Sequence, residues 1–291
     1  MKEKILLTLT LLLLAGERSA QAAADEWKLL FSLQTEKGGA PLSHPVGLYV
    51  DGQAERYYVA DSGHDRLVSF DKSGRFLHAF NAGKSLQKPI AMIKRGDGRL
   101  LVLEKGEAVL TEIDLKTREV VPHRLLDQGR EVYPQRLKAG EQTLYLLDKA
   151  SGGILLLDQG LKVKGRLSCP ECQAGYADFA IKGGAVYALP LLGAEIHVFD
   201  VQGALTHTIP LSPAPEFPVS LALGPDGGFL VLERHANTVV HYHGDGRLLG
   251  RYLGPGHKEG SLSYPAEIQV DPWGRVCIVD EGNGRVGVFK P

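Results

Sequence analysis

A repeated acidic residue is the first feature of this sequence that could do chemistry. Each acid ends a short apolar run, and in two places an arginine follows five residues later. The acids are Asp61, Glu104, Asp148, Glu233 and Asp280, with Arg66 and Arg285 after the first and the last. Such a carboxylate can accept hydrogen bonds from the backbone N–H groups of the turn that follows, and an arginine can pair with it. Because the acid recurs, we expect it to hold turns together; the alternative is that it lines a polar face.

Two cysteines form the second chemical feature, in the run Cys169-Pro170-Glu171-Cys172. In an exporting compartment this spacing predicts a small local disulfide. A redox-active pair is the alternative, although such pairs stand at the start of a helix in an alternating strand and helix fold. Zinc would need a second pair of ligands, and haem attachment would need histidine in place of Gln173. Cys277 lies in an apolar run, so we expect a buried, unpaired thiol.

Motifs of nucleophilic catalysis do not occur in the sequence. It contains no Gly-x-Ser-x-Gly elbow, no His-Glu-x-x-His run and no phosphate-cradling glycine loop. This lowers the expectation of an enzyme without excluding one, because a catalytic site can also be assembled from loops that lie far apart in the sequence.

The composition is that of a globular protein with many turns. The 291 residues are 44% hydrophobic and 23% charged, and they include 35 glycines and 16 prolines. The formal net charge of −1 leaves no surplus positive field, which argues against a nucleic-acid or anionic-membrane binder.

The first 24 residues have the pattern of a secretory signal peptide. Lys2 and Lys4 precede an apolar stretch over residues 5–16, and small residues end the segment at Ala22 and Ala24. The apolar stretch is short for a bilayer span, which needs about 20 residues, so an uncleaved anchor is the weaker alternative. We therefore predict an exported protein without a membrane span after cleavage, in the periplasm or outside the cell, with residues 25–291 as one domain.

The rest of the chain repeats with a period of 41–47 residues. Each unit opens on a pair of residues that usually ends in proline, and the repeated acid follows about 15 residues later. The openings are His44-Pro45, Lys88-Pro89, Tyr133-Pro134, Tyr176-Ala177, Phe217-Pro218 and Tyr264-Pro265. Within a unit, short apolar segments alternate with turns such as Asp97-Gly98 and Asp226-Gly227, which are typical of hairpins.

Six such units predict an all-β fold, a six-bladed β-propeller with four antiparallel strands per blade. The last unit ends one strand short, whereas residues 27–33 form a spare strand ahead of the first unit. We expect this N-terminal strand to complete the last blade, which removes an exposed sheet edge at each end of the chain.

The units resemble NHL repeats. The similarity is strongest in the runs that begin at Val59-Ala60-Asp61 and at Ile278-Val279-Asp280, and it is weaker in the second to fourth units. The resemblance implies a six-bladed propeller of the exported bacterial kind. It implies no single activity, since the family and related six-bladed folds include binding platforms, RNA-binding modules, and metal-dependent lyases and lactonases.

The propeller fold places several candidate residues together. The loops of one face contain four histidines: His44, His64, His235 and His257. The places where the first strands open on the central channel contain Arg136, Asp178 and Glu267. The two carboxylates could bind a hard cation such as calcium, or form an ion pair with Arg136. As candidate binding residues the sequence favours His64, Arg66, Arg136, Arg234, His235, Glu267 and Arg285.

The sequence favours an exported binding or scaffold module for a protein, peptide or carbohydrate partner, because blades hold loops on a rigid frame. This hypothesis requires no cofactor and no nucleic acid. The alternative is a periplasmic lyase or lactonase that uses calcium or zinc in the central channel, with Asp178, Glu267 and a histidine of the face.

Overall fold

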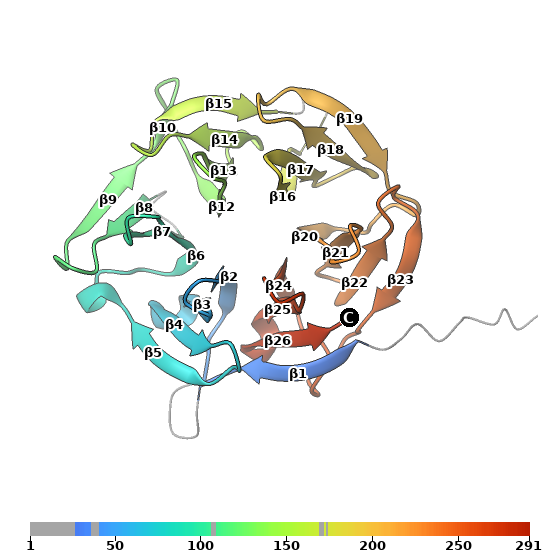
Figure 1. Cartoon of the computed structure of the whole chain (residues 1–291), viewed down its shortest axis with the longest axis horizontal. Helices are drawn as coiled ribbons and strands as arrows, with labels where there is room; N and C mark the ends of the chain where they lie inside the picture. The colour runs from blue at the N-terminus through green and yellow to red at the C-terminus, as the bar shows by residue number, and fades with distance from the viewer. Residues whose placement is uncertain (1–26, 36–40, 106–108, 169–171, 173) are drawn as a thin grey trace, which may run out of the picture.

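Six four-stranded antiparallel sheets stand around a common centre in the computed structural model (Figure 1). The structure describes residues 27–35, 41–105, 109–168, 172 and 174–291. The predicted all-β, six-bladed propeller is therefore confirmed. The predicted signal peptide, residues 1–24, lies outside the described residues and stays a prediction.

The strands follow the repeat found in the sequence, and each blade is named here by its order in the chain. Blade 1 contains β2 (Pro45–Asp51), β3 (Arg56–Asp61), β4 (Arg66–Asp71) and β5 (Phe76–Phe80). Blade 2 contains β6 (Pro89–Lys94), β7 (Leu100–Glu104), β8 (Val109–Ile113) and β9 (Val120–Arg124). Blade 3 contains β12 (Pro134–Ala139), β13 (Leu144–Asp148), β14 (Ile154–Leu157) and β15 (Val163–Leu167).

The second half of the ring has the same order. Blade 4 contains β16 (Tyr176–Lys182), β17 (Ala185–Pro190), β18 (Glu195–Phe199) and β19 (Leu205–Pro210). Blade 5 contains β20 (Pro218–Leu223), β21 (Phe229–Glu233), β22 (Thr238–Tyr242) and β23 (Leu248–Tyr252). Blade 6 contains β24 (Pro265–Val270), β25 (Val276–Asp280), β26 (Arg285–Lys290) and β1 (Lys28–Leu33).

Short elements complete the described chain. A hairpin of β10 (Leu126–Asp127) and β11 (Arg130–Glu131) links blades 2 and 3. Single 3-10 turns occur at η1 (Ser62–His64), η2 (Ala82–Lys84) and η3 (Glu281–Asn283). No helix in the described part of the chain is both long and apolar enough to cross a bilayer.

The core lies between neighbouring blades. The second strands β7, β13, β21 and β25 are buried at every position, which is why they appear in the sequence as continuous apolar runs instead of alternating patterns. Cys277 on β25 is free and fully buried, as predicted.

The N-terminal strand closes the ring. β1 pairs antiparallel with β26, and Figure 1 shows the blue strand beside the red one. Leu33 is fully buried, and the ring of Trp27 stacks on that of Tyr252 with centroids 4.9 Å apart. The predicted closure is confirmed, with the strand beginning one residue after Trp27.

The first strand of each blade, β2, β6, β12, β16, β20 or β24, lies nearest the central channel, and we call it the inner strand (Figure 1). Each inner strand begins with a β-bulge, and this irregularity positions the side chains at the channel. In β2, Pro45 pairs with Asp61 and Gly47 with Ala60, so the residue between them is skipped. The same shift occurs at the start of β6, β12, β16, β20 and β24. A bulge can re-aim the side chains beside it. We call the third residue of each inner strand the channel position; it is occupied by Gly47, Ala91, Arg136, Asp178, Ser220 and Glu267.

Candidate functional site

The face on which the inner strands begin carries most of the predicted site residues, and we call it the upper face. The loops that enter the inner strands and the turns that follow the second strands both lie there. We call the residues directly before the inner strands and directly after the second strands the upper rim. They are His44, Lys88, Tyr133, Gly175, Phe217 and Tyr264 before the inner strands, and Ser62, Lys105, Lys149, Leu191, Arg234 and Glu281 after the second strands.

The repeated acids hold the loops of the upper face. Asp61 accepts the N–H of Ser43 at 2.6 Å, and Asp280 accepts the N–H of Ser263 at 2.7 Å. The corresponding pairs are Glu104 with Gln87, Asp148 with Tyr133, and Glu233 with Glu216. The expected turn-holding role is therefore supported.

The expectation that these acids accept hydrogen bonds from the turn that follows them is wrong for four of the five. Among these five acids, only Asp148 has hydrogen bonds from following backbone N–H groups, those of Ala150 and Ser151 at 3.1 Å each. The others accept from the loop that enters the same blade, because the second strand ends beside the start of the inner strand.

Three predicted binding residues, His64, Arg66 and Arg285, form hydrogen bonds with these acids of the loops. Nε of Arg66 lies 2.6 Å from Oδ2 of Asp61, and Nδ1 of His64 lies 3.0 Å from the same oxygen. Arg285 pairs with Asp280 at 3.1 Å and also donates to the carbonyls of Lys258 and Ser261. These side chains stabilise the face, and their polar groups already have partners.

Arg234 and His235 lie beside exposed aromatic rings of the upper rim. Arg234 forms an ion pair with Glu281 at 2.7 Å, and its guanidinium lies 5.8 Å from the ring centroid of Tyr264. His235 packs edge-on against Phe217, with centroids 5.7 Å apart. The structure thus brings these two predicted residues to the mouth of the channel.

Exposed aromatic residues give the upper rim an unusual surface. Tyr133, Phe217 and Tyr264 are 46%, 64% and 56% exposed. Aromatic side chains are enriched at interaction surfaces relative to the rest of a protein surface. A depression of about 510 Å³ lies beside Tyr264 and is also lined by His44, Arg234 and Asn283.

Lysines occupy the rim of blades 2 and 3, where Tyr133 also lies. Lys88, Lys105 and Lys149 are exposed. Backbone hydrogen bonds tie Lys105 to Lys88 at 3.0 Å and Lys149 to Tyr133 at 2.8 Å, so these positions are neighbours. Glu281 is the sole carboxylate among the rim residues, and Arg234 already neutralises it.

Below the rim, polar side chains at the channel position form a plug. Arg136 crosses from blade 3 to the carbonyls of Val219 and Ala266, at 3.2 and 3.0 Å. Oδ2 of Asp178 accepts from the hydroxyl of Ser220 at 2.7 Å, and Oε2 of Glu267 accepts from the N–H of Leu48 at 2.9 Å. The bonds of Arg136 therefore cross the channel, whereas those of Asp178 and Glu267 link the inner strands of neighbouring blades.

Lys138 is a channel residue that sequence reasoning missed. Its ammonium lies 2.9 Å from Oδ1 of Asp178 and also donates to the carbonyl of Phe179. Arg136 lies 3.8 Å from the same carboxylate oxygen. A lysine two positions after Arg136 on the same strand was the available clue, because alternate residues of a strand share one face.

The two buried carboxyl groups differ in electrostatics. Burial alone would raise the pKa of Asp178, but Lys138, Arg136 and the hydrogen bond from Ser220 hold it below its ordinary value. Burial raises the pKa of Glu267, the cations oppose this only in part, and the charge of Asp178 adds to the increase.

The channel fits an ion-pair network better than a metal site. Asp178 and Glu267 direct their oxygens at cations and N–H donors of the protein. Within the described ranges, no three His, Cys, Asp or Glu side chains converge as a metal centre would need. We therefore derive no chemical step through calcium or zinc.

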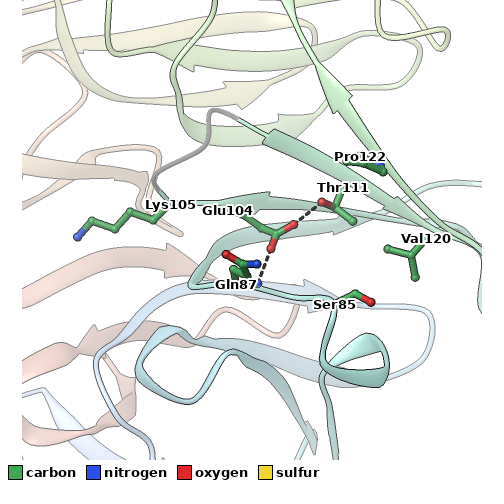
Figure 2. A pocket seen from close by; sticks show the side chains of 7 residues that line it. All are labelled: Ser85, Gln87, Glu104, Lys105, Thr111, Val120 and Pro122. Carbon is green, nitrogen blue, oxygen red and sulfur yellow. Dashed lines mark hydrogen bonds between the residues drawn. The ribbon is translucent and has the colours of Figure 1, made fainter.

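A separate pocket of about 290 Å³ lies on blade 2 (Figure 2). Glu104 lines this pocket, and Figure 2 shows its carboxylate accepting hydrogen bonds from the backbone N–H of Gln87 and the hydroxyl of Thr111. Because both carboxylate oxygens have protein partners, the pocket presents no unsatisfied acid.

The predicted disulfide is only partly within the described chain. Cys172 is disulfide-bonded. Cys169 lies outside the described residues, so the pairing of these two residues stays a prediction.

Comparisons with known proteins support the fold and do not show a family. No family model matches the chain. The E3 ubiquitin-protein ligase TRIM56 of Bos taurus and that of Homo sapiens are each 27% identical to this chain over 146 residues. That segment is 49% of this chain, and the match spans only 19% of the length of those relatives.

Solved structures show the same architecture at low sequence identity. A streptogramin B lyase has a TM-score of 0.64 and 16% identity, and covers 89% of this chain and 96% of its own. The virginiamycin B lyase from Staphylococcus aureus has a TM-score of 0.65 and 14% identity, covering 91% and 100%. A Kuenenia stuttgartiensis hydrazine synthase chain has a TM-score of 0.59 and 11% identity, covering 88% and 99%. The shared property is the propeller fold.

Proposed function

We propose that this protein is an exported binding module of the NHL type, and that its upper rim binds a protein or peptide partner. The observation that carries the proposal is that the upper rim exposes three aromatic residues, Tyr133, Phe217 and Tyr264, and three lysines, Lys88, Lys105 and Lys149. Surfaces that combine aromatic anchors with cations are typical of interaction sites.

The chemistry of the rim defines the kind of partner. Lys88, Lys105 and Lys149 favour carboxylates, whereas the rings of Phe217 and Tyr264 favour apolar or aromatic side chains. The partner should therefore carry acidic residues next to an apolar anchor. A carbohydrate could also stack on the rings, but a neutral sugar would not respond to the lysines.

Backbone strain around the mouth supports the proposal. His44, Lys88, Phe217 and Tyr264 all have φ values between 45° and 50°, immediately before the proline that opens an inner strand. This left-handed region costs a residue with a side chain about 1–2 kcal/mol. In blade 4 this place is taken by Gly175, with a φ of 70°. The predicted alignment of Tyr176 with these residues is therefore wrong by one position, because Tyr176 is already the first residue of β16. A glycine here indicates that the turn itself needs no side chain. Strained residues gathered at one place favour a functional role there.

Two parts of the proposal rest on the sequence. The NHL assignment is supported by the repeat beginning at Val59-Ala60-Asp61 and by the six-bladed fold. Export, to the periplasm or beyond the cell, is supported by the charged, apolar and small-residue order of residues 1–24.

A lyase or lactonase is the second candidate, favoured by the fold shared with the two streptogramin-type lyases. The engaged carboxylates of Asp178 and Glu267 weigh against it. Metal analysis of the purified, dialysed protein separates the two candidates. Stoichiometric calcium or zinc together with turnover of a cyclic ester would support the enzyme and oppose the binding module.

A comparative capture experiment tests the binding module. Tagged protein with Lys88, Lys105 and Lys149 each replaced by glutamate is compared with wild type in envelope extracts of the producing cell. We expect a partner that wild type retains to lose at least tenfold in recovery, because attraction becomes repulsion.

The matched control replaces Lys116, Lys162 and Lys164, which lie in hairpins of the opposite face, by glutamate. This variant changes the net charge equally and should retain the partner. Equal losses in both variants, or none in either, would contradict the proposal. Retention of the partner together with displacement by a neutral sugar would favour a carbohydrate.

A further inference from the structure

Three of the five acids that hold the loops of the upper face also form an ion pair with an arginine. The pairs are Asp61 with Arg66 at 2.6 Å, Glu233 with Arg251 at 2.6 Å, and Asp280 with Arg285 at 3.1 Å. Each of these acids accepts a loop N–H at the same time. A carboxylate has about four lone-pair sites, so the loop N–H and the arginine bind it together.

Glu104 of blade 2 has the loop N–H but no arginine. Among the described residues, it accepts only from the backbone of Gln87 and the hydroxyl of Thr111, and both donors are uncharged. Asp148, the other acid without an arginine, accepts four hydrogen bonds. Glu104 is 8% exposed, and a buried carboxylate without a counter-ion is costly. The hydrogen bonds of Glu104 thus leave its charge uncompensated and leave lone pairs for further donors.

The strand register shows where an arginine of blade 2 would lie. In blade 5, Arg251 on the outer strand β23 reaches Glu233 on β21 across β22. Arg251 stands opposite the β22 residue that pairs two positions before the acid. In blade 2, Pro122 on β9 has this same position relative to Glu104. A short proline ring therefore takes the place of a long cationic side chain.

The pocket of about 290 Å³ on blade 2 lies between Pro122 and Glu104, where that arginine side chain would run (Figure 2). Glu104 and Thr111 are buried, whereas Ser85, Gln87 and Pro122 are exposed. The carboxylate is thus at the inner end of the pocket, and a ligand can reach it past the exposed residues.

The remaining lining residues suit a cation with a short alkyl stem. Val120 and Pro122 form an apolar side of the pocket. Lys105 also lines it, but Figure 2 shows its ammonium directed away from Glu104. Glu104, Thr111 and Gln87 each offer an oxygen acceptor, and a guanidinium has five N–H donors with which to meet several acceptors at once.

We infer that this pocket binds an alkylguanidinium group, which takes the place in blade 2 that Arg251 has in blade 5. Glu104 accepts charge-assisted hydrogen bonds from the guanidinium, and the alkyl stem packs on Val120 and Pro122. The volume lies at the lower end of the range of ligand pockets, roughly 300–1,000 Å³, which favours a ligand the size of one side chain. The group can come from a free small molecule or from an arginine of a protein partner.

Calorimetric titration of the full chain with butylguanidinium chloride tests the inference. We expect saturable binding at one site. Butylurea, which has nearly the same shape without the charge, should bind about tenfold or more weakly. Glu104→Gln keeps an acceptor for the N–H of Gln87 but removes the charge, and it should weaken butylguanidinium binding by a similar factor.

Pro122→Arg gives an independent variant, because its side chain would bring a guanidinium to Glu104 and fill the pocket from within. Butylguanidinium binding should weaken about tenfold or more in this variant, even if Glu104→Gln does not fold. Leu115→Arg is the matched control. It adds the same charge to blade 2 at a position that is 52% exposed, in the hairpin between β8 and β9, and should bind as wild type does.

A blocked Gly-Arg-Gly peptide distinguishes the two sources of the group. Binding of this peptide as tightly as butylguanidinium would assign the site to an arginine of a protein, and binding of butylguanidinium alone to a free small molecule. No saturable binding of either probe at millimolar concentration, equal affinity for butylurea, or unchanged affinity in Pro122→Arg would overturn the inference. The upper rim proposal is tested separately, because none of these variants changes Lys88, Lys105 or Lys149.

Discussion

Two carboxyl groups at the channel position, Asp178 in blade 4 and Glu267 in blade 6, show how the local environment determines the pKa of each group. Asp178 has Lys138, Arg136 and Ser220 as partners, and its pKa lies below the ordinary range although burial opposes this. Glu267 is equally buried but accepts from Leu48 and Gln269, both uncharged, and its pKa is raised. The negative charge of Asp178 further raises the pKa of Glu267. The surroundings therefore shift the pKa values of these two buried carboxyl groups in opposite directions.

Replacing Glu267 by glutamine should change the pH dependence of stability. In the wild type, the folded state holds the Glu267 proton more tightly than the unfolded state, so the stability from this group is lost as pH rises from about 4.5 through the raised pKa. Glutamine cannot ionise and still offers an oxygen to the N–H of Leu48. We expect the free energy of unfolding of Glu267→Gln, relative to wild type, to increase between pH 4 and pH 8 in urea titrations.

Asp178→Asn is the control of opposite sign. The lowered pKa of Asp178 means that its contribution is present above its ordinary value of 3.8 and is lost as pH falls through the folded-state pKa. The destabilisation by this variant should therefore shrink in acid. Identical pH profiles for the two variants would contradict the electrostatic account.

At the scale of elements, the inner strands determine how the blades meet. In blades 4, 5 and 6 the channel position carries a polar side chain that bonds to the next strand, as Ser220 does with the N–H of Ile268 at 3.1 Å. Between blades 1 and 2 no side chain fits. A Cβ on Gly47 would lie 2.2 Å from the carbonyl oxygen of Ile90, so β2 and β6 approach through their backbones.

Gly47→Ala should consequently destabilise the protein by about 2–4 kcal/mol, because a rigid backbone atom has to move. Gly96→Ala is the matched control, since a Cβ there meets nothing within 4 Å, and it should change stability by less than about 0.5 kcal/mol. Chemical denaturation of both variants measures the difference. An equal effect of the two substitutions would mean that the close approach of β2 and β6 is not needed.

The limits of prediction from sequence also appear at the element scale. The prolines at the unit openings and the acids at the ends of the second strands allowed the blades to be predicted from the sequence. Both residue types occur there because the local backbone conformation favours them. The hydrogen bond from Ser43 to Asp61 joins the ends of two paired strands of blade 1, and the contact of Lys138 with Asp178 joins blades 3 and 4. Such partners follow from bulges and blade packing, which the order of residues does not reveal.

At the scale of the whole molecule, closure converts an open array of sheets into a ring. β1 covers the edge of β26, and Trp27 and Leu33 are buried there. Without this strand, β26 would present an unpaired edge, which favours aggregation.

A chain that begins at Pro41 tests closure. Loss of the buried side chains of Trp27 and Leu33 should cost about 3–6 kcal/mol and lower the melting temperature. A synthetic peptide covering residues 27–35 should bind the shortened chain and restore most of the loss. If the shortened chain melts like the full one, or if the peptide has no effect while a scrambled peptide does, closure by β1 is not what stabilises the ring.

Site-specific photo-crosslinking in the producing cell tests the upper rim most directly. A photoreactive phenylalanine replaces Phe217 on the rim, and in a control it replaces Leu205 on β19, which is 52% exposed but lies away from the rim. The account predicts a discrete crosslinked protein from position 217 and none from position 205. A crosslink from position 205 alone, or none from position 217, would contradict it.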